Sequence, residues 1–156
     1  MFQPKDIMTH IKTFEDAVLE LGYNNQVVID YYAISNTTYT EDILAFSKLK
    51  VIAEALNEGW KPTFDENECR YYTWFYIYTK AEYEKLNENE KKNCRVVGRS
   101  VSSSNANGCL AYAFAYTASS NSLAYNGSRL AFKTRELAEY CGKQFIDIWV
   151  DFLFMK

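Results

Sequence analysis

The sequence lacks several features that would assign it at once to a class of proteins. No stretch approaches about 18 uninterrupted apolar residues, so the sequence predicts no membrane span and no membrane partner. The amino-terminal residues Met1 to Asp6 lack the basic and then apolar pattern of a signal peptide, so we expect no secretion by that route. The composition, with 48% hydrophobic and 24% charged residues, excludes disorder as the overall state.

Histidine is almost absent, because His10 is the only one. This excludes a zinc site with two histidines and leaves a Ser-His-Asp or Cys-His catalytic site only this one residue. The four cysteines, at positions 69, 94, 109 and 141, include no close pair, so the spacing of a zinc ribbon is absent too. Without a signal peptide they are interpreted as buried free thiols. We therefore expect no metal, no cofactor and no disulfide.

Aromatic side chains are abundant, at 17% of the residues, and only 6 glycines and 2 prolines accompany them. Many rigid rings indicate a large buried area per residue, an exposed aromatic surface that binds other molecules, or both. A dense aromatic core is the simpler interpretation. The length of 156 residues suits one domain, residues 1–156, since two domains would each be small for an independent core.

Helical periodicity and start signals predict three helices, over about residues 13–21, 41–58 and 135–153. The first is preceded by a capping box in which Asp16 replaces the usual Glu or Gln, Thr40 is expected to cap the second, and Thr134 the third. A second capping box predicts a short helix after Thr79. Residues 27–29 are compatible with a strand or a buried connection, and residues 87–93 have the composition of a loop.

The remaining pattern predicts an antiparallel sheet, with strands over about residues 69–78, 94–101, 110–117, 122–125 and 128–133. The first has large side chains on both faces, which is typical of a central strand. Residues 110–116 alternate large side chains with alanine, so a strand would place all four large groups on one face. Asn126-Gly127 is a strong hairpin signal, and its register would place Arg129, Ala131 and Lys133 on one outward face. We therefore predict an α+β fold with helices on at least one face of the sheet.

Several stretches resemble small uncharacterised proteins encoded by phages and mobile elements of gut bacteria. They are residues 12–17 (KTFEDA), 53–62 (AEALNEGWKP), 127–147 (GSRLAFKTRELAEYCGKQFID) and Asp151-Phe152. The resemblance covers about half of the chain and is much weaker between about residues 63 and 126. It implies a phage-type origin and a setting in the bacterial host cytoplasm or the phage virion, and it carries no catalytic residue.

Charge is distributed unevenly along the chain. Residues 91–135 contain seven of the 17 basic residues and none of the 20 acidic ones. Within them, residues 102–128 carry no charge and are rich in Tyr, Ser, Asn and Gly, a mixture typical of recognition loops. Two interpretations stay open: the cations pair with acidic groups elsewhere in the fold, or they gather into a cationic, aromatic surface for an anionic partner.

The candidate binding residues are Arg95, Arg99, Tyr112, Tyr116, Arg129, Lys133 and Arg135. The leading hypothesis is a non-enzymatic phage-type interaction module that binds a protein, or an anionic partner such as a nucleotide or nucleic acid, through residues 95–135. No phosphate loop is present, because the required Gly-Lys-Ser or Gly-Lys-Thr ending is missing. The alternatives are a structural or assembly component of a phage virion, or an enzyme of unknown class, for which paired carboxylates such as Asp65 and Glu66 are weak support.

Overall fold

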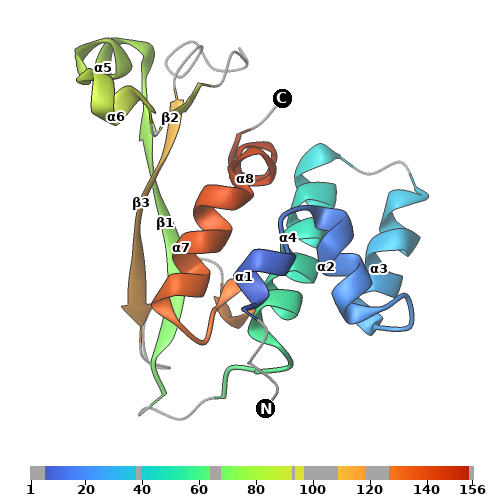
Figure 1. Ribbon diagram of the computed structural model, residues 1–156. Coiled ribbons are helices and arrows are strands. Elements are labelled where there is room, and N and C mark those ends of the chain that lie inside the picture. The colour runs from blue at the N-terminus through green and yellow to red at the C-terminus, as the bar shows by residue number, and fades with distance from the viewer. Residues whose placement is uncertain are drawn as a thin grey trace.

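The computed structural model describes residues 6–37, 40–63, 68–92, 94–96, 109–118 and 127–154. Within these residues helices dominate, and a three-stranded sheet accompanies them (Figure 1). The mixture of helices and strands expected from the sequence is therefore confirmed in its coarse form, with a larger helical share. Within the same residues, no helix is long and apolar enough to cross a membrane.

The amino-terminal part begins with a single helical turn, α1 (Ile7–His10), followed by α2 (Phe14–Leu21). The predicted capping box is confirmed: Asp16 donates its backbone N–H to Thr13 Oγ1 at 3.1 Å, and the Thr13 N–H binds Asp16 Oδ2 at 2.8 Å. These two bonds satisfy amide groups that the start of a helix leaves unpaired, which is why α2 begins at Phe14.

Residues 27–29, left open between a strand and a connection, lie in a helix, α3 (Gln26–Ser35). The Asn25 side chain accepts the Val27 N–H at 3.0 Å and so caps the helix. Val28 is fully buried in the core. The β-branched residues therefore adopt a helix because the cap and the packing against the next helix outweigh their weak preference for strands.

The longest helix is α4 (Glu41–Asn57). It packs against α2, α3 and α8, so its buried residues surround much of the helix and do not form one stripe: Ala45, Leu49, Val51, Ile52, Ala53, Ala55 and Leu56. The expectation that Thr40 caps it is wrong in one respect, because Thr40 occupies the N-cap position but its side chain makes no capping hydrogen bond.

The sheet consists of β1 (Arg70–Tyr78), β2 (Cys94–Val96) and β3 (Cys109–Ala118), all antiparallel to their neighbours. The strand order is β1-β3-β2, so β3 lies in the middle and the prediction that β1 is the central strand is wrong. The large side chains of β1 are accommodated because one face of this strand packs on helices. Thr73 Oγ1 donates to the Ala138 carbonyl at 2.8 Å, and the Phe75 ring lies 5.1 Å from that of Trp149. Residues 97–101 and 122–125 lie outside the described residues.

The pairing of β1 with β3 contains a register shift. Trp74 pairs with Phe114, but the next residue of β1, Phe75, pairs with Tyr112, so Ala113 is an extra residue on β3. Such a bulge interrupts the two-residue alternation of a strand. The prediction that all four large residues of 110–116 share one face concerns side chains that lie outside the described part of the structure.

The hairpin predicted at Asn126-Gly127 is wrong for its second strand. Residues Gly127–Leu130 form a 3-10 helix, η1, and the strand-like pairing that follows within residues 131–154 is an isolated bridge between Phe132 and Tyr71. Leu130, Ala131 and Phe132 are all buried, so the residues do not alternate between two faces. The physical reason is that this segment passes between α4 and β1 and is covered from both sides.

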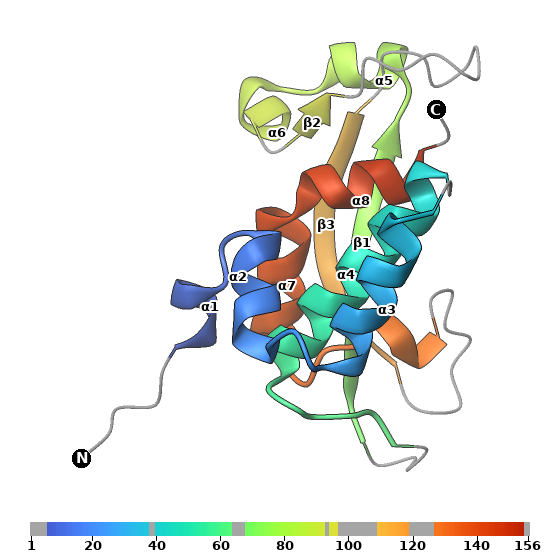
Figure 2. The same ribbon diagram turned by 90° about the vertical axis from the view of Figure 1, so that its right-hand side faces the viewer.

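The carboxyl-terminal segment, predicted as one helix, forms two: α7 (Arg135–Gln144) and α8 (Ile146–Leu153). Buried Phe145 interrupts the helical backbone with φ −109° and ψ 28°. The break lets α7 lie on the sheet while α8 packs on α4, so this pair separates the sheet from α1 to α4 (Figures 1 and 2). The apolar core lies on both sides of this helical layer.

Two short helices follow β1. Thr79 and Glu82 form the predicted capping box, with bonds of 2.8 and 3.3 Å, at the start of α5 (Lys80–Lys85). The segment predicted as a loop contains α6 (Glu88–Lys92), which begins after Asn87, whose side-chain oxygen accepts a backbone N–H of the helix at 2.9 Å. The prediction of a loop over residues 87–93 is therefore wrong for residues 88–92, because Asn87 caps a helix there.

Candidate functional site

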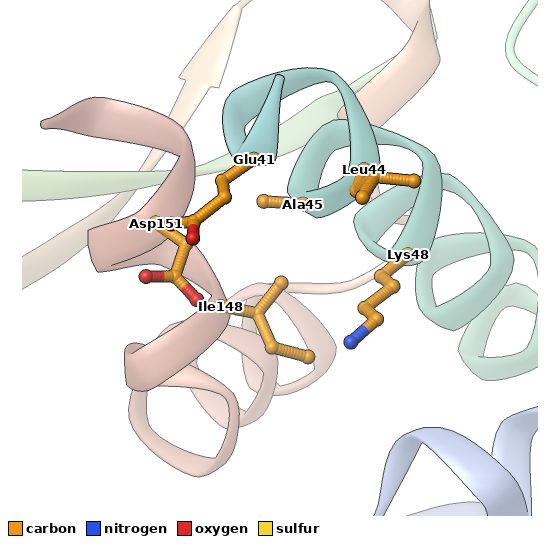
Figure 3. A pocket seen from close by; sticks show the side chains of 6 residues that line it. All are labelled: Glu41, Leu44, Ala45, Lys48, Ile148 and Asp151. Atoms are coloured by element: carbon orange, nitrogen blue, oxygen red, sulfur yellow. The ribbon is translucent and has the colours of Figure 1, made fainter. Parts of the chain in front are cut away.

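A first hollow, of about 220 Å³, lies between α4 and α8. Figure 3 shows the Glu41 and Asp151 side chains converging from the two helices, with Lys48 on the other side of the hollow. The Lys48 ammonium also lies 5.5 Å from the centre of the Phe14 ring. Two carboxylates and one ammonium give this hollow mixed charge, and such a mixture selects no single class of ligand.

A second hollow, of about 320 Å³, has a different character. We call it the cationic groove. Its described lining combines three cations and one tryptophan with smaller or neutral groups and one carboxylate: Val27, Lys50, Ala53, Glu54, Asn57, Trp60, Lys61, Pro62, Arg129 and Ala131. These residues come from α3, α4, the segment after α4, and η1 with the residue that follows it, which are brought together only by folding.

One face of α4 forms a wall of the groove. Lys50, Glu54 and Asn57 are four and three residues apart, which places them along the same side of a helix. Glu54 Oε1 accepts a hydrogen bond from Asn25 Nδ2 at 3.3 Å, so part of the single carboxylate's accepting capacity is already used. Three cations against one hydrogen-bonded carboxylate make the groove locally positive, although the whole chain has a formal charge of −3.

Asn57 holds the opposite wall in place. Its buried side chain donates from Nδ2 to the Ala131 carbonyl at 2.8 Å and accepts the Lys133 N–H on Oδ1 at 3.0 Å. The two bonds join residues 74 and 76 positions apart in the chain and fix the segment that follows η1 against α4. Arg129 therefore reaches the groove because a buried asparagine anchors the backbone beside it.

The end of α4 positions Trp60. Glu58 adopts the left-handed conformation with φ 50°, and Gly59 follows with φ 83°. Such a pair turns the chain back on the helix, and the Trp60 N–H then binds the Asn57 carbonyl at 3.0 Å. The turn thereby places Trp60, Lys61 and Pro62 along the groove. Gly59 suits this position because a residue without Cβ adopts positive φ without strain.

Within the described part of the chain, the structure does not gather the predicted binding residues into one surface. Arg129 is exposed and lines the groove, whereas Lys133 is half-buried and its ammonium pairs with Glu58 Oε2 at 2.5 Å. The expectation that Arg129 and Lys133 share an outward strand face is therefore wrong, because η1 replaces the strand and Lys133 is neutralised locally. Arg135 is exposed as the first residue of α7, and it is not among the lining residues.

The other predicted residues belong to the sheet. Arg95 lies in β2, opposite Leu110, which in turn pairs with Ile77 near one end of β1. The segment that carries Arg129 meets β1 at Tyr71, so six residues of strand, about 20 Å, separate the two places. Tyr112 and Tyr116 occupy positions in β3. Arg99 lies outside the described residues.

No family model, no curated protein and no solved structure matches the chain.

Residues of the groove that sequence reasoning missed are Lys50, Trp60 and Lys61. Lys50 and Lys61 lie in the acid-rich part of the chain, where a count of charge by segment hides them. The signal that could have identified the tryptophan is the Glu58-Gly59-Trp60-Lys61-Pro62 run directly after a predicted helix, since a glycine there indicates a chain reversal that returns the next residues toward the helix.

The described carboxyl groups whose pKa is shifted lie outside the groove, and two of them, Asp16 and Glu82, cap helix starts. A backbone hydrogen bond from Lys12 holds the pKa of Asp16 below its usual value, and one from Thr79 does the same for Glu82. Burial raises the pKa of the Cys141 thiol to about 12. The prediction of buried thiols is confirmed for Cys141 and is wrong for Cys69, which is exposed. Among the described residues, no group of three or more His, Cys, Asp or Glu side chains could hold a metal ion.

Proposed function

We propose that the chain is a non-enzymatic interaction module that binds an anionic partner through the cationic groove. The observation that carries this proposal is the convergence of Lys50, Lys61 and Arg129, from three separate segments, on one hollow of about 320 Å³. Concave cationic surfaces raise the local concentration of anions and give each contact less competition from water than a flat surface does.

Two features favour binding over catalysis. The polar side chains among the groove's described lining are ammonium, guanidinium, amide, indole and a single carboxylate, a set that contains no nucleophile paired with a base. Asn57 uses both its donor and its acceptor to hold the backbone around Ala131 and Lys133. The groove therefore offers preorganised positive charge and an aromatic ring, which suit recognition.

The proposed setting is the bacterial host cytoplasm or the phage virion. Its support is the resemblance of residues 12–17, 53–62 and 127–147 to small phage-encoded proteins. Two of these stretches contribute to the groove, with Ala53 to Pro62 on one side and Arg129 and Ala131 on the other. The partner is accordingly expected to be a molecule that phage and host share or exchange.

Titration calorimetry with inorganic triphosphate at low and moderate salt tests the proposal. The parent should bind, and added salt should weaken binding because exposed charges are screened. The variant Lys50→Glu/Lys61→Glu/Arg129→Glu should lose binding by more than about tenfold, which corresponds to about 1.4 kcal/mol.

A matched control carries the same change of charge elsewhere. Lys80, Lys85 and Lys143 are exposed cations outside the groove, so reversing all three should leave affinity within about twofold. Equal losses in both triple variants would mean that only the net charge matters, and would refute a specific site. Circular dichroism and thermal melting establish that each variant is folded.

A second candidate is a structural or assembly role, favoured by exposed apolar side chains on β1. Trp74, Tyr76 and Ile77 are 39%, 54% and 48% exposed. Clusters of this kind are often buried between subunits. If this role holds, light scattering across a concentration series should reveal oligomers of the parent, and the variant Trp74→Ser/Tyr76→Ser should be monomeric. A parent that is monomeric at all concentrations would exclude the role.

A further inference from the structure

We propose that the anionic ligand of the cationic groove is a single nucleotide unit, with its phosphates on the three cations and its base against Trp60. This inference rests on the proposed function and narrows the class of ligand. Its starting point is that an aromatic ring and three cations line the same hollow (Lys50, Lys61 and Arg129 beside Trp60). A nucleotide is the common metabolite that combines several negative charges with a flat aromatic ring.

The aromatic residue distinguishes this ligand from a bare anion. Bases stack on aromatic side chains with little dependence on their identity, because every base has a π-face. Trp60 is half-buried and is held by its backbone bond to Asn57 behind the left-handed turn. The bond fixes the backbone that carries the ring, so less conformational freedom is lost when a ligand packs on it.

The single carboxylate also favours a nucleotide. Glu54 would repel a bare phosphate, but a carboxylate readily accepts hydrogen bonds from hydroxyl groups. Asn25 occupies one of its acceptor sites, on Oε1 at 3.3 Å. A sugar hydroxyl placed between the base and the phosphates is the donor that such a carboxylate suits, so the lining pairs each part of a nucleotide with a group of matching chemistry.

The size of the groove limits the ligand to one unit. Pockets for small ligands hold about 300–1,000 Å³, and the groove, at about 320 Å³, lies at the lower end. It therefore accommodates one nucleotide, either free or at the end of a strand, and not a duplex. Lys133 would add little to phosphate binding because Glu58 already neutralises it at 2.5 Å.

Calorimetry without magnesium compares adenosine triphosphate with inorganic triphosphate, which carries the same phosphates but no base or sugar. The parent should bind the nucleotide about tenfold more tightly, in line with the contribution of one stacked base. Trp60→Ala should abolish this preference and leave inorganic triphosphate binding within about twofold. Trp60→Phe keeps a ring and should retain part of the preference. Trp74→Ala, at an exposed tryptophan on β1, should change neither affinity.

The outcomes separate the two proposals. If neither triphosphate nor nucleotide binds, the proposed function fails. If triphosphate binds but the nucleotide is no tighter, or Trp60→Ala keeps the preference, only the nucleotide assignment is overturned. Tighter binding of a hexaglutamate peptide than of the nucleotide would also overturn it, in favour of an acidic protein partner.

Binding of a single-stranded decanucleotide distinguishes a free nucleotide from a nucleotide at the end of a strand. Binding that is tighter than that of the free nucleotide and depends on Trp60 identifies a strand end as the ligand, and weaker binding identifies the free nucleotide. Decamer binding that exceeds nucleotide binding and is unchanged in Trp60→Ala would contradict the proposed site.

Discussion

Replacing Asn57 by alanine should destabilise the fold and impair the groove together. The substitution removes two buried hydrogen bonds, one to the Ala131 carbonyl at 2.8 Å and one from the Lys133 N–H at 3.0 Å. Each of the two backbone groups left unpaired costs about 1–3 kcal/mol, so the free energy of unfolding should fall by roughly 2–6 kcal/mol. Urea denaturation followed by circular dichroism measures this change.

The matched control is Asn24→Ala, which alters an exposed asparagine in the turn before α3 and should cost less than about 0.5 kcal/mol. Asn57→Ala should also weaken triphosphate binding under conditions where the protein stays folded, because the segment carrying Arg129 loses its anchor on α4. A loss below about 1 kcal/mol would refute the view that this asparagine fixes the groove. So would unchanged triphosphate affinity in a folded, clearly destabilised variant.

Three further predictions concern stability and reactivity. Phe145→Ala should lower the free energy of unfolding by about 3–5 kcal/mol, because the ring is buried at the break between α7 and α8; a loss under 1 kcal/mol in urea melts would mean that the break is not packed. Because the folded-state pKa of Asp16 is depressed, its contribution is present above the unfolded-state pKa and is lost as pH falls through the folded value. In Asp16→Asn, stability should therefore fall less steeply with pH than in the parent when both are melted between about pH 5 and 2. An unchanged pH dependence would contradict the capping role of Asp16. Cys141 is buried with a pKa of about 12, so a thiol reagent at pH 8 should label exposed Cys69 at once and Cys141 only after unfolding; equal rates in the native state would show that the core opens.

Local signals in the sequence predicted the elements whose causes are local. Thr13 with Asp16, and Thr79 with Glu82, specify helix starts through bonds between residues three apart, and both are present. The alternating run within residues 110–117 predicted β3, since a regular alternation of large and small groups suits a strand.

The elements that were wrongly predicted from the sequence depend on contacts between distant segments. Residues 127–130 form η1 and Phe132 is buried against β1, because α4 covers this segment from the other side. The hairpin signal at Asn126-Gly127 contains no information about α4. Similarly, Phe145 ends one helix and precedes another because the sheet and α4 require different directions from α7 and α8.

The candidate site shows the same division. Arg129 could be identified because it belongs to a segment with basic and no acidic residues. Lys50 and Lys61 could not, since the part of the chain before residue 91 has an excess of acidic residues, and only folding, with Asn57 as an anchor, brings these lysines beside Arg129. A cluster assembled by a hydrogen bond across 74 residues leaves no pattern in the local sequence.

The central claim is that anions bind between α4, the segment after it, and η1. The most direct measurement is the change in backbone amide chemical shifts during a titration with inorganic triphosphate. The largest saturable changes should fall on residues 50–62 and 127–133. Saturable changes centred on β2, β3 or α5, or no saturable change at all, would contradict the claim.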